Sequence, residues 1–257
     1  MFTDSYGPWA VVAGASEGMG AQFAKQLSAR GLKVVLIARR EQVLTELAST
    51  LSGETKCLAL DLASPEAPAR IAEFTRELDV GLVIYNAALS PIGPFVEQSL
   101  ADNLRAIDVN VKTPTALAHH FVPRLVKRGK GGLVLLSSLT AFQGSPFVST
   151  YGATKSYNLS LAEGLWGELR GTGVDVLSVC AGATATPNLL KSVKTAPPGM
   201  QQPEEVVREA LDALKDGPVL IPGRFNRFAS FLMRRLLPRR STIQIMAGQT
   251  RKLQLPP

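Results

Sequence analysis

Three side chains in residues 138–155 have the types and the spacing of an acid–base site. Ser138 is followed by Tyr151 thirteen positions later and by Lys155 four positions after that. If the chain is helical from about residue 150, Tyr151 and Lys155 lie one turn apart on one face. A nearby ammonium lowers a phenol pKa from about 10, which makes a tyrosine usable as a general acid or base. Ser138 can hydrogen-bond the same substrate oxygen, although a Tyr–Lys pair at this spacing also occurs on solvated helix faces.

A glycine-rich turn near the N-terminus separates two apolar segments. Residues 9–13 and 33–38 are apolar and flank a helical pattern, which predicts a strand–turn–helix–strand unit. In such a unit Gly14 allows a tight turn, Gly18 lets the backbone approach a pyrophosphate, and Gly20 lets helix and strand pack closely. The spacing is G-x-x-x-G-x-G rather than the commoner G-x-G-x-x-G, and glycine turns also occur for purely structural reasons.

The residues after the second apolar segment bear on the choice of dinucleotide. An acid there would accept hydrogen bonds from a ribose 2′-hydroxyl, but this chain has Arg39 and Arg40. Arginine suits a 2′-phosphate by its charge and its planar fork, so NADP(H) is favoured and NAD(H) is the alternative. Both arginines could instead face water at the end of a strand, and Glu17 would be unfavourable beside a phosphate.

Strand-like and helical segments alternate along the chain, which predicts an α/β fold. The expected strands are residues 9–13, 33–38, 56–60, 80–85, 133–136, 174–179 and 218–221, and the expected helices after the first are residues 41–51, 65–78, 100–127, about 150–170 and 203–215. We therefore predict a single Rossmann-type, doubly wound parallel sheet with helices on both faces and ligands at the strand C-terminal ends. Pro114 and Pro123 are expected to kink or break the long helix.

The chain divides by charge rather than by linkers or repeats. We expect residues 1–222 to be the catalytic domain, with residues 187–202 as a flexible lid, and residues 223–257 to be a basic extension. Asp216 is the last acidic residue, so the excess of positive residues that gives the net charge of +7 lies in this extension. Its positive residues are Arg224, Arg227, Arg234, Arg235, Arg239, Arg240, Arg251 and Lys252.

Residues 224–240 have the pattern of an amphipathic helix, for which two interpretations remain open. The apolar stripe comprises Phe225, Phe228, Ala229, Leu232 and Leu236. We favour a helix that packs this stripe on the body or on a neighbouring subunit. The alternative is an interfacial helix that lies on an anionic membrane or guides an amphipathic substrate. No aromatic and basic platform for nucleic acid accompanies the charge.

Several other classes of protein are disfavoured. Cys57 and Cys180 lie in or beside apolar segments and are expected to be buried thiols in a reducing compartment. His119 and His120 are adjacent and therefore make a poor metal pair, so no metal is expected. No segment approaches the roughly 18 apolar residues of a membrane span, and no signal peptide is recognisable. We expect a cytoplasmic protein, with peripheral membrane contact through the basic extension as an alternative.

Taken together, residues 9–221 resemble the short-chain dehydrogenase/reductase family. The resemblance rests on the motif at residues 13–20 and on Asp61, Asn86, Ala87, Ala88, Asn110, Ser138, Tyr151, Lys155 and residues 182–186. It implies that Tyr151 is the acid/base, that Lys155 lowers the tyrosine pKa and binds the nicotinamide ribose, and that Ser138 polarises the substrate oxygen. It also implies that Asn110 holds a water in a proton relay. Family members are usually homodimers or homotetramers assembled through the helices near Asn110 and after Tyr151.

The same resemblance implies where the cofactor binds. Asp61 would contact the adenine, residues 86–88 would line the adenosine side, Ser16 and Arg39 would hold a 2′-phosphate, and residues 182–186 would meet the nicotinamide carboxamide. The expected cofactor residues are Gly14, Ser16, Glu17, Gly18, Met19, Gly20, Arg39, Arg40, Asp61, Leu62, Asn86, Ala87, Ala88, Tyr151, Lys155, Gly182, Thr184 and Thr186.

Three alanines depart from the family's pattern without removing a reacting group. Ala13 replaces a threonine before the first glycine, Ala88 replaces a glycine after Asn-Ala, and Ala181 replaces a proline before Gly182. The expected function is reduction of a ketone by NADPH on a bulky apolar substrate of 3-oxoacyl, steroid-like or polyketide type. The alternatives are alcohol oxidation by the same site and a non-enzymatic dinucleotide sensor.

Overall fold

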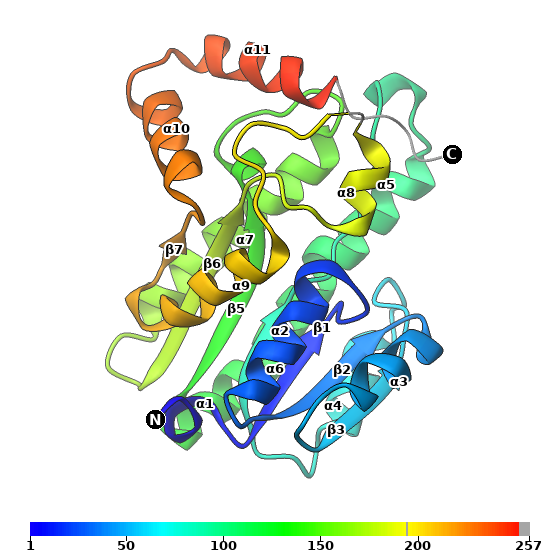
Figure 1. Cartoon of the computed structure of the whole chain (residues 1–257), viewed down its shortest axis with the longest axis vertical. Helices are drawn as coiled ribbons and strands as arrows, with labels where there is room; N and C mark the ends of the chain where they lie inside the picture. Colours follow the sequence, from blue (N-terminus) through cyan, green and yellow to red (C-terminus); the bar gives the residue numbers. More distant parts are fainter. Residues whose placement is uncertain (194, 252–257) are drawn as a thin grey trace.

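One seven-stranded sheet forms the centre of the molecule in the computed structural model, which describes residues 1–193 and 195–251 (Figure 1). The strands are β1 (Trp9–Ala13), β2 (Lys33–Ala38), β3 (Thr55–Ala59), β4 (Val80–Tyr85), β5 (Gly131–Ser138), β6 (Val174–Ala181) and β7 (Val219–Leu220). Their order is β3-β2-β1-β4-β5-β6-β7, and every neighbouring pair is parallel. The chain changes direction across the sheet between β1 and β4, where a doubly wound fold forms its ligand crevice. The predicted fold class is confirmed.

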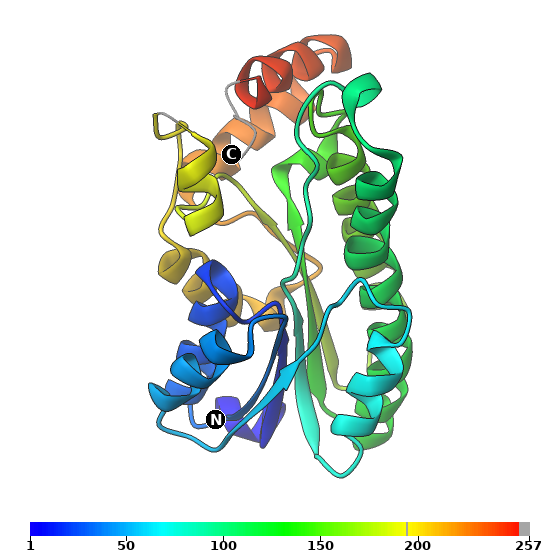
Figure 2. The ribbon, with the colours of Figure 1, turned by 90° about the vertical axis from the view of Figure 1, so that its right-hand side faces the viewer.

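Helices cover both faces of the sheet, as Figure 2 shows from the side. On one face lie α2 (Gly18–Ala29), α3 (Glu41–Ser49) and α9 (Pro203–Asp212), and on the other lie α4 (Ala67–Phe74), α6 (Thr113–Arg128) and α7 (Ser149–Glu168). Successive residues of β1 face opposite helix layers. Val12 packs in the apolar cluster that contains Phe23 of α2, and Val11 packs in the cluster that contains Phe121 of α6. Burial on both sides explains why β1 is apolar without alternation. A short helix that the sequence analysis did not predict, α1 (Phe2–Tyr6), precedes the sheet.

The predicted long helix over residues 100–127 is interrupted, but not at its prolines. It consists of α5 (Leu100–Ile107), a π-helical segment η2 (Asp108–Lys112) and α6. Pro114 lies in the first turn of α6, where its missing N–H is tolerated, and α6 continues past Pro123 to Arg128. The hydroxyl of Tyr85 donates to the carbonyl of Val109 inside η2. The expected proline breaks are therefore wrong, and the irregular turn coincides with Asn110.

The other predicted elements occur, with helices that end earlier than expected and with β5 and β6 longer than expected, and short helices add detail. The 3₁₀ segments are η1 (Phe95–Glu97), η3 (Leu139–Phe142) and η4 (Leu214–Asp216). The expected flexible lid contains a helix, α8 (Pro187–Ser192), whose first turn is capped by the Thr186 hydroxyl accepting from the N–H of Leu189 at 3.3 Å. The expected single helix over residues 224–240 is two helices, α10 (Arg224–Arg235) and α11 (Arg239–Thr250), because Pro238 starts the second one.

The helix α10 buries polar residues against the body of this chain rather than the phenylalanines of the expected stripe. Its buried residues are the polar Asn226 and Ser230, whereas Phe225, Phe228 and Phe231 are 56%, 62% and 58% exposed. The interpretation that the phenylalanines of the stripe pack on the chain's own body is therefore wrong. None of the helices in the described ranges is long and apolar enough to cross a membrane.

Candidate active site

Ser138, Tyr151 and Lys155 come together where β5 ends and α7 begins. Ser138 is the last residue of β5, and the other two lie in the first two turns of α7. The hydroxyl of Ser137 donates to the carbonyl of Lys155 at 2.8 Å, which fixes α7 against the end of β5. Lys155 Nζ lies 5.5 Å from the centre of the Tyr151 ring. The arrangement can present a hydroxyl pair and an amine to one substrate oxygen.

The pKa values of Tyr151 and Lys155 are shifted mainly by burial. Burial raises the pKa of Tyr151, and a hydrogen bond with Ser138 opposes the rise. Burial also lowers the pKa of Lys155 from 10.5 to about 8. Lys155 Nζ donates to the carbonyl of Leu136 at 2.7 Å. The expected lowering of the Tyr151 pKa by Lys155 is therefore not seen in the protein alone, where burial raises this pKa and only Ser138 opposes the rise.

Asn110 joins three segments around this group. It is fully buried within η2, where its Oδ1 accepts from the N–H of Leu89 at 2.8 Å and its Nδ2 donates to the carbonyl of Leu89 at 2.8 Å. Nδ2 also donates to Thr154 Oγ1 at 3.0 Å, and Thr154 donates to the carbonyl of Tyr151. Both amide hydrogens are thus used within the protein. The side chain of Asn110 ties the segment after β4 to the helix that carries Tyr151.

A cavity of about 460 Å³ opens beside the ends of β1, β2 and β4 and contains most of the expected cofactor residues. Those that line it are Gly14, Ser16, Glu17, Gly18, Met19, Arg39, Arg40, Asp61, Leu62, Asn86, Ala87, Ala88 and Thr186. The expected residues outside its lining are Gly20, Tyr151, Lys155, Gly182 and Thr184.

Two glycines shape the turn at the edge of this cavity. Gly14 has a φ of +86°, and a Cβ there would lie 2.6 Å from the backbone nitrogen of Ala87. A Cβ on Gly20 would overlap the carbonyl oxygen of Gly14. The turn therefore needs glycine at both positions for close packing. The side chain of Asn86 supports it by donating to the carbonyl of Gly14 at 2.8 Å.

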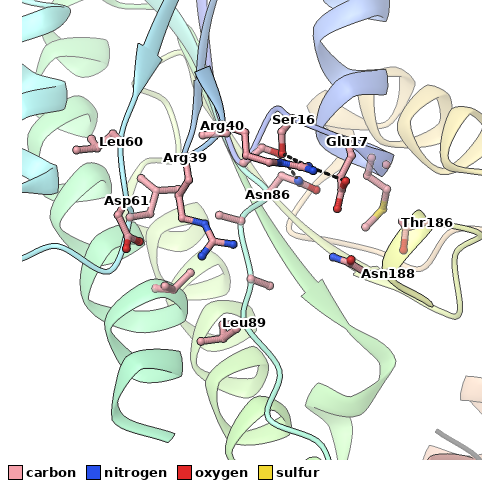
Figure 3. Close-up of a pocket in the computed structure, with 18 of the residues that line it drawn as sticks. Ser16, Glu17, Arg39, Arg40, Leu60, Asp61, Asn86, Leu89, Thr186 and Asn188 are labelled. Atoms are coloured by element: carbon pink, nitrogen blue, oxygen red, sulfur yellow. Dashed lines mark hydrogen bonds and ion pairs between the residues drawn. The ribbon is translucent and has the colours of Figure 1, made fainter. Parts of the chain in front are cut away.

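The two arginines after β2 have different surroundings, as Figure 3 shows. Arg40 Nη2 lies 2.7 Å from Glu17 Oε2 and donates to Ser16 Oγ at 3.4 Å. Arg39 extends into the cavity and forms no ion pair within residues 1–193 and 195–251 (Figure 3). The unfavourable carboxylate of Glu17 is thus paired by one arginine, while the other is available to an anion.

Asp61 lies at the far side of the cavity and is held by a second arginine. Partial burial alone would raise the pKa of its carboxyl, but the N–H of Ala63, the guanidinium of Arg105 and the charge of Arg39 hold it below 3.8. Arg105 Nη2 lies 2.5 Å from Asp61 Oδ2. The carboxylate therefore stays ionised and can accept a hydrogen bond from an adenine amino group.

The cavity fits the dinucleotide implied by the sequence. Its glycine turn leads into the N-terminus of α2, where the first N–H groups of a helix have no intrahelical partner and attract phosphate. Arg39 supplies an unpaired positive charge for a further phosphate. Asn86 Oδ1 is buried without a hydrogen-bond partner in the described structure, so an acceptor remains for a ligand hydroxyl.

The loop of residues 182–186, which is expected to contact the nicotinamide, is held by residues from the basic extension. Its backbone pairs with the far end of the lid, since the N–H of Ala185 donates to the carbonyl of Gln201 at 2.9 Å and the N–H of Gln201 donates to that of Ala183 at 3.0 Å. Asn226 of α10 packs against Gly182, and its Nδ2 lies 3.1–3.2 Å from the carbonyl oxygens of Gly199 and Pro222 and from Gln201 Oε1, which share its two amide hydrogens. The extension therefore supports the far end of the lid and the loop that precedes the lid.

Several of these residues were not predicted from the sequence. Arg105, Leu89, Val109 and Asn188 line the cavity, and Thr154 and Asn226 position the residues around it. A signal existed for Arg105, because it lies on the helical pattern before Asn110 and Asp61 needs a partner. The sequence offers no comparable signal for Asn226, whose partners lie 25 and 27 residues away.

Comparison with known proteins points to one family. The model for short chain dehydrogenase matches residues 8–196. The 7β-hydroxysteroid dehydrogenase of Clostridium sardiniense is 33% identical over 233 residues, which cover 88% of this chain and 89% of the relative. A solved 7β-hydroxysteroid dehydrogenase, studied for its stereoselectivity, has a TM-score of 0.89 at 31% identity and covers 95% of this chain and 98% of its own.

A second solved structure was determined with a cofactor. It is a short-chain dehydrogenase from Sphingobium yanoikuyae in complex with NADPH, with a TM-score of 0.78 at 30% identity over 87% of this chain and 92% of its own. The seven-stranded parallel sheet flanked by helices agrees with these structural matches. The chain belongs to the short-chain dehydrogenase family of oxidoreductases, which act on CH–OH and C=O groups.

Proposed function

We propose that this oxidoreductase uses NADP(H) to reduce the ketone of a bulky, apolar, steroid-like substrate, with Tyr151 as the general acid. The observation that carries the proposal is the pairing of Arg40 with Glu17, which leaves Arg39 available in the cavity for a 2′-phosphate. The NADPH complex of the Sphingobium relative supports the same cofactor. An NAD(H)-dependent enzyme remains the alternative.

The proposed reaction assigns a separate task to each side chain. Bound NADPH would supply a hydride to the carbonyl carbon. Tyr151 gives its hydroxyl proton to the carbonyl oxygen, and Ser138 donates a hydrogen bond to the same oxygen. Lys155 holds a positive charge beside the phenolate that forms, and Asn110 anchors the relay that returns a proton to Tyr151. The reverse sequence, in which Tyr151 accepts the proton, oxidises an alcohol.

The substrate class is inferred from the relatives and from the lid. The matched relative from Clostridium sardiniense is a 7β-hydroxysteroid dehydrogenase. Leu190 on α8 is 52% exposed and offers an apolar surface on the lid. A 7-oxo steroid is therefore the first substrate to test, ahead of 3-oxoacyl and polyketide-type ketones.

Loss of NADPH absorbance with a series of ketones tests the proposal. We expect rates to rise from a short-chain ketone to a long-chain 3-oxoacyl compound and then to a 7-oxo steroid. Equal rates with NADH would overturn the cofactor assignment. No turnover with any ketone, together with separately measured NADPH binding, would favour the non-enzymatic sensor.

The substitution Tyr151→Phe separates an enzyme from a sensor. Removal of the hydroxyl deletes the proton donor but keeps the ring, so we expect kcat to fall about 100- to 10,000-fold. NADPH affinity, measured by titration of the cofactor fluorescence, should stay within about threefold because the adenosine half is untouched. Turnover at the wild-type rate in this variant would contradict the mechanism.

The assembly and location of the protein stay predictions. We propose a homodimer or homotetramer formed through α6 and α7. Val126 on α6 and Tyr157 on α7 are each 38% exposed and are available for such a contact. A cytoplasmic location is proposed from the sequence alone.

A further inference from the structure

The exposed face of α10 carries aromatic side chains where a solvated helix would carry polar ones. Phe225, Phe228 and Phe231 are each more than half exposed. The apolar surface continues past the end of the helix with Leu236 and Leu237, which are 66% and 40% exposed. A monomeric soluble protein seldom leaves such a patch bare, so this face is expected to have a partner.

Positive charges surround this face without acids to balance them. Arg227 pairs with Glu209 at 2.9 Å, and the guanidinium of Arg234 stacks 4.0 Å from the ring centre of Phe142. Arg224, Arg235, Arg239 and Arg240 are exposed and form no ion pair within residues 1–193 and 195–251. The sequence contains no Asp or Glu after Asp216. Phenylalanines bordered by unpaired arginines combine the two attractions of an interfacial helix.

We propose that the exposed face of α10, with Leu236 and Leu237, binds an anionic lipid surface. A phosphate-bearing bilayer offers negative charge to the arginines and an apolar layer to the phenylalanines at the same time. A second copy of this chain fits less well. In a two-fold contact each patch meets itself, so Arg224 and Arg235 of both copies would face one another without an acid from this segment.

The position of α10 gives this contact a consequence for the active site. The helices α8, α10 and α11 lie together at the end of the molecule where the strands terminate (Figures 1 and 2). Asn226 on the buried side of α10 holds the far end of the lid, at Gly199 and Gln201. A protein docked through the outer side of α10 would thus have its lid beside the bilayer, where an amphipathic substrate is concentrated.

Co-sedimentation of the full chain with vesicles tests the inference directly. We expect binding to equimolar phosphatidylglycerol and phosphatidylcholine vesicles, little binding to phosphatidylcholine alone, and loss of binding at high salt. The double variant Phe228→Ser with Phe231→Ser should bind at least about tenfold more weakly. Each of Arg235→Gln and Arg240→Gln should weaken binding about fivefold.

A matched control is available at exposed apolar residues elsewhere. Phe95 and Val96 are 61% and 92% exposed, and the double variant Phe95→Ser with Val96→Ser should bind vesicles like the wild type. Equal loss in this control would overturn the assignment to α10, as would absence of binding to anionic vesicles at low salt. A doubled mass in light scattering that disappears in the Phe228/Phe231 variant would show a contact between copies and overturn the proposal. The outcome is independent of the proposed ketone reduction, which is measured on soluble substrates.

Discussion

At the scale of single residues, Arg39 and Arg40 show how two identical neighbours acquire different tasks. Arg40 is held by Glu17 and Ser16, whereas Arg39 points into the cavity near Asp61 (Figure 3). The ion pair removes the negative charge that would otherwise oppose a phosphate at the glycine turn. Cofactor selection should therefore depend on Arg39 far more than on Arg40.

The substitution Arg39→Ala tests this division. Loss of a charge-assisted hydrogen bond to the 2′-phosphate should raise the KM for NADPH about 10- to 100-fold and leave the KM for NADH almost unchanged. The measurement is steady-state kinetics with both cofactors. The matched variant Arg40→Ala should behave differently, because it exposes the carboxylate of Glu17 to the pyrophosphate shared by both cofactors. Equal loss with NADPH and NADH in Arg39→Ala would contradict the assignment.

Lys155 gives a second prediction at this scale, in the pH dependence of stability. Its pKa of about 8 in the folded state lies below the ordinary 10.5, so between these values the unfolded chain binds more protons than the folded one. The folded state is therefore stabilised as the pH rises through this window, and below pH 8 the buried ammonium keeps its full destabilising effect. Relative to Lys155→Met, the free energy of unfolding of the wild type should increase by up to about 3 kcal/mol.

Denaturant unfolding of both proteins at several pH values measures this difference. Subtracting the free energy of unfolding of the variant from that of the wild type at each pH cancels the contribution of the other titrating groups. Parallel stability curves across the window would show that Lys155 titrates normally in the folded protein.

At the scale of elements, the lid depends on a helix outside the doubly wound unit. Asn226 on α10 donates to Gly199, Gln201 and Pro222, and Gln201 pairs with the loop after β6. These bonds hold residues 199–201, at the far end of the lid, beside the loop after β6. The basic extension thus contributes to the geometry of the site as well as to surface charge.

The substitution Asn226→Ala should loosen the far end of the lid. We expect the KM for the ketone to rise about tenfold, since buried carbonyl partners lose their donor. Affinity for 2′,5′-ADP, measured by calorimetry, should remain unchanged because the adenosine side of the cavity is formed by other elements. Ser230→Ala is the control on the same buried face, since the Ser230 hydroxyl has no hydrogen-bond partner among the described residues. Parallel loss of 2′,5′-ADP affinity in Asn226→Ala would indicate general damage to the fold.

The elements differ in how far the sequence could predict them. The strand–turn–helix unit at residues 9–38 was predictable because the turn in it requires glycine at Gly14 and Gly20. The π-helical turn at Asn110 was not, because a bond from Tyr85, 24 residues earlier, contributes to it. The burial of the polar face of α10 was not predictable, because an apolar stripe ordinarily faces the core, whereas here Asn226 finds its partners there.

At the scale of the whole molecule, the sheet order brings distant sequence motifs to one edge. Residues after β1, β2, β3 and β4 line a single cavity, and the end of β5 carries Ser138. Alternation of strands and helices predicted this convergence, since parallel strands end on the same side. The bounds of the lid and the packing of the extension depend on contacts across the molecule and were therefore not predictable in detail.

The order β3-β2-β1-β4-β5-β6-β7 also has a consequence for synthesis on the ribosome. The first three strands pair from the centre outwards in one direction, and each later strand adds to the free edge of the growing sheet on the other side. No strand has to insert between two that are already paired, so the nascent chain can extend its sheet without rearrangement. The cavity wall from β1 to β4 is translated in the first third of the chain, whereas Asn226 is translated near its end. A nascent chain would therefore form most of the wall of its nucleotide-binding cavity well before Asn226 is available to hold the lid.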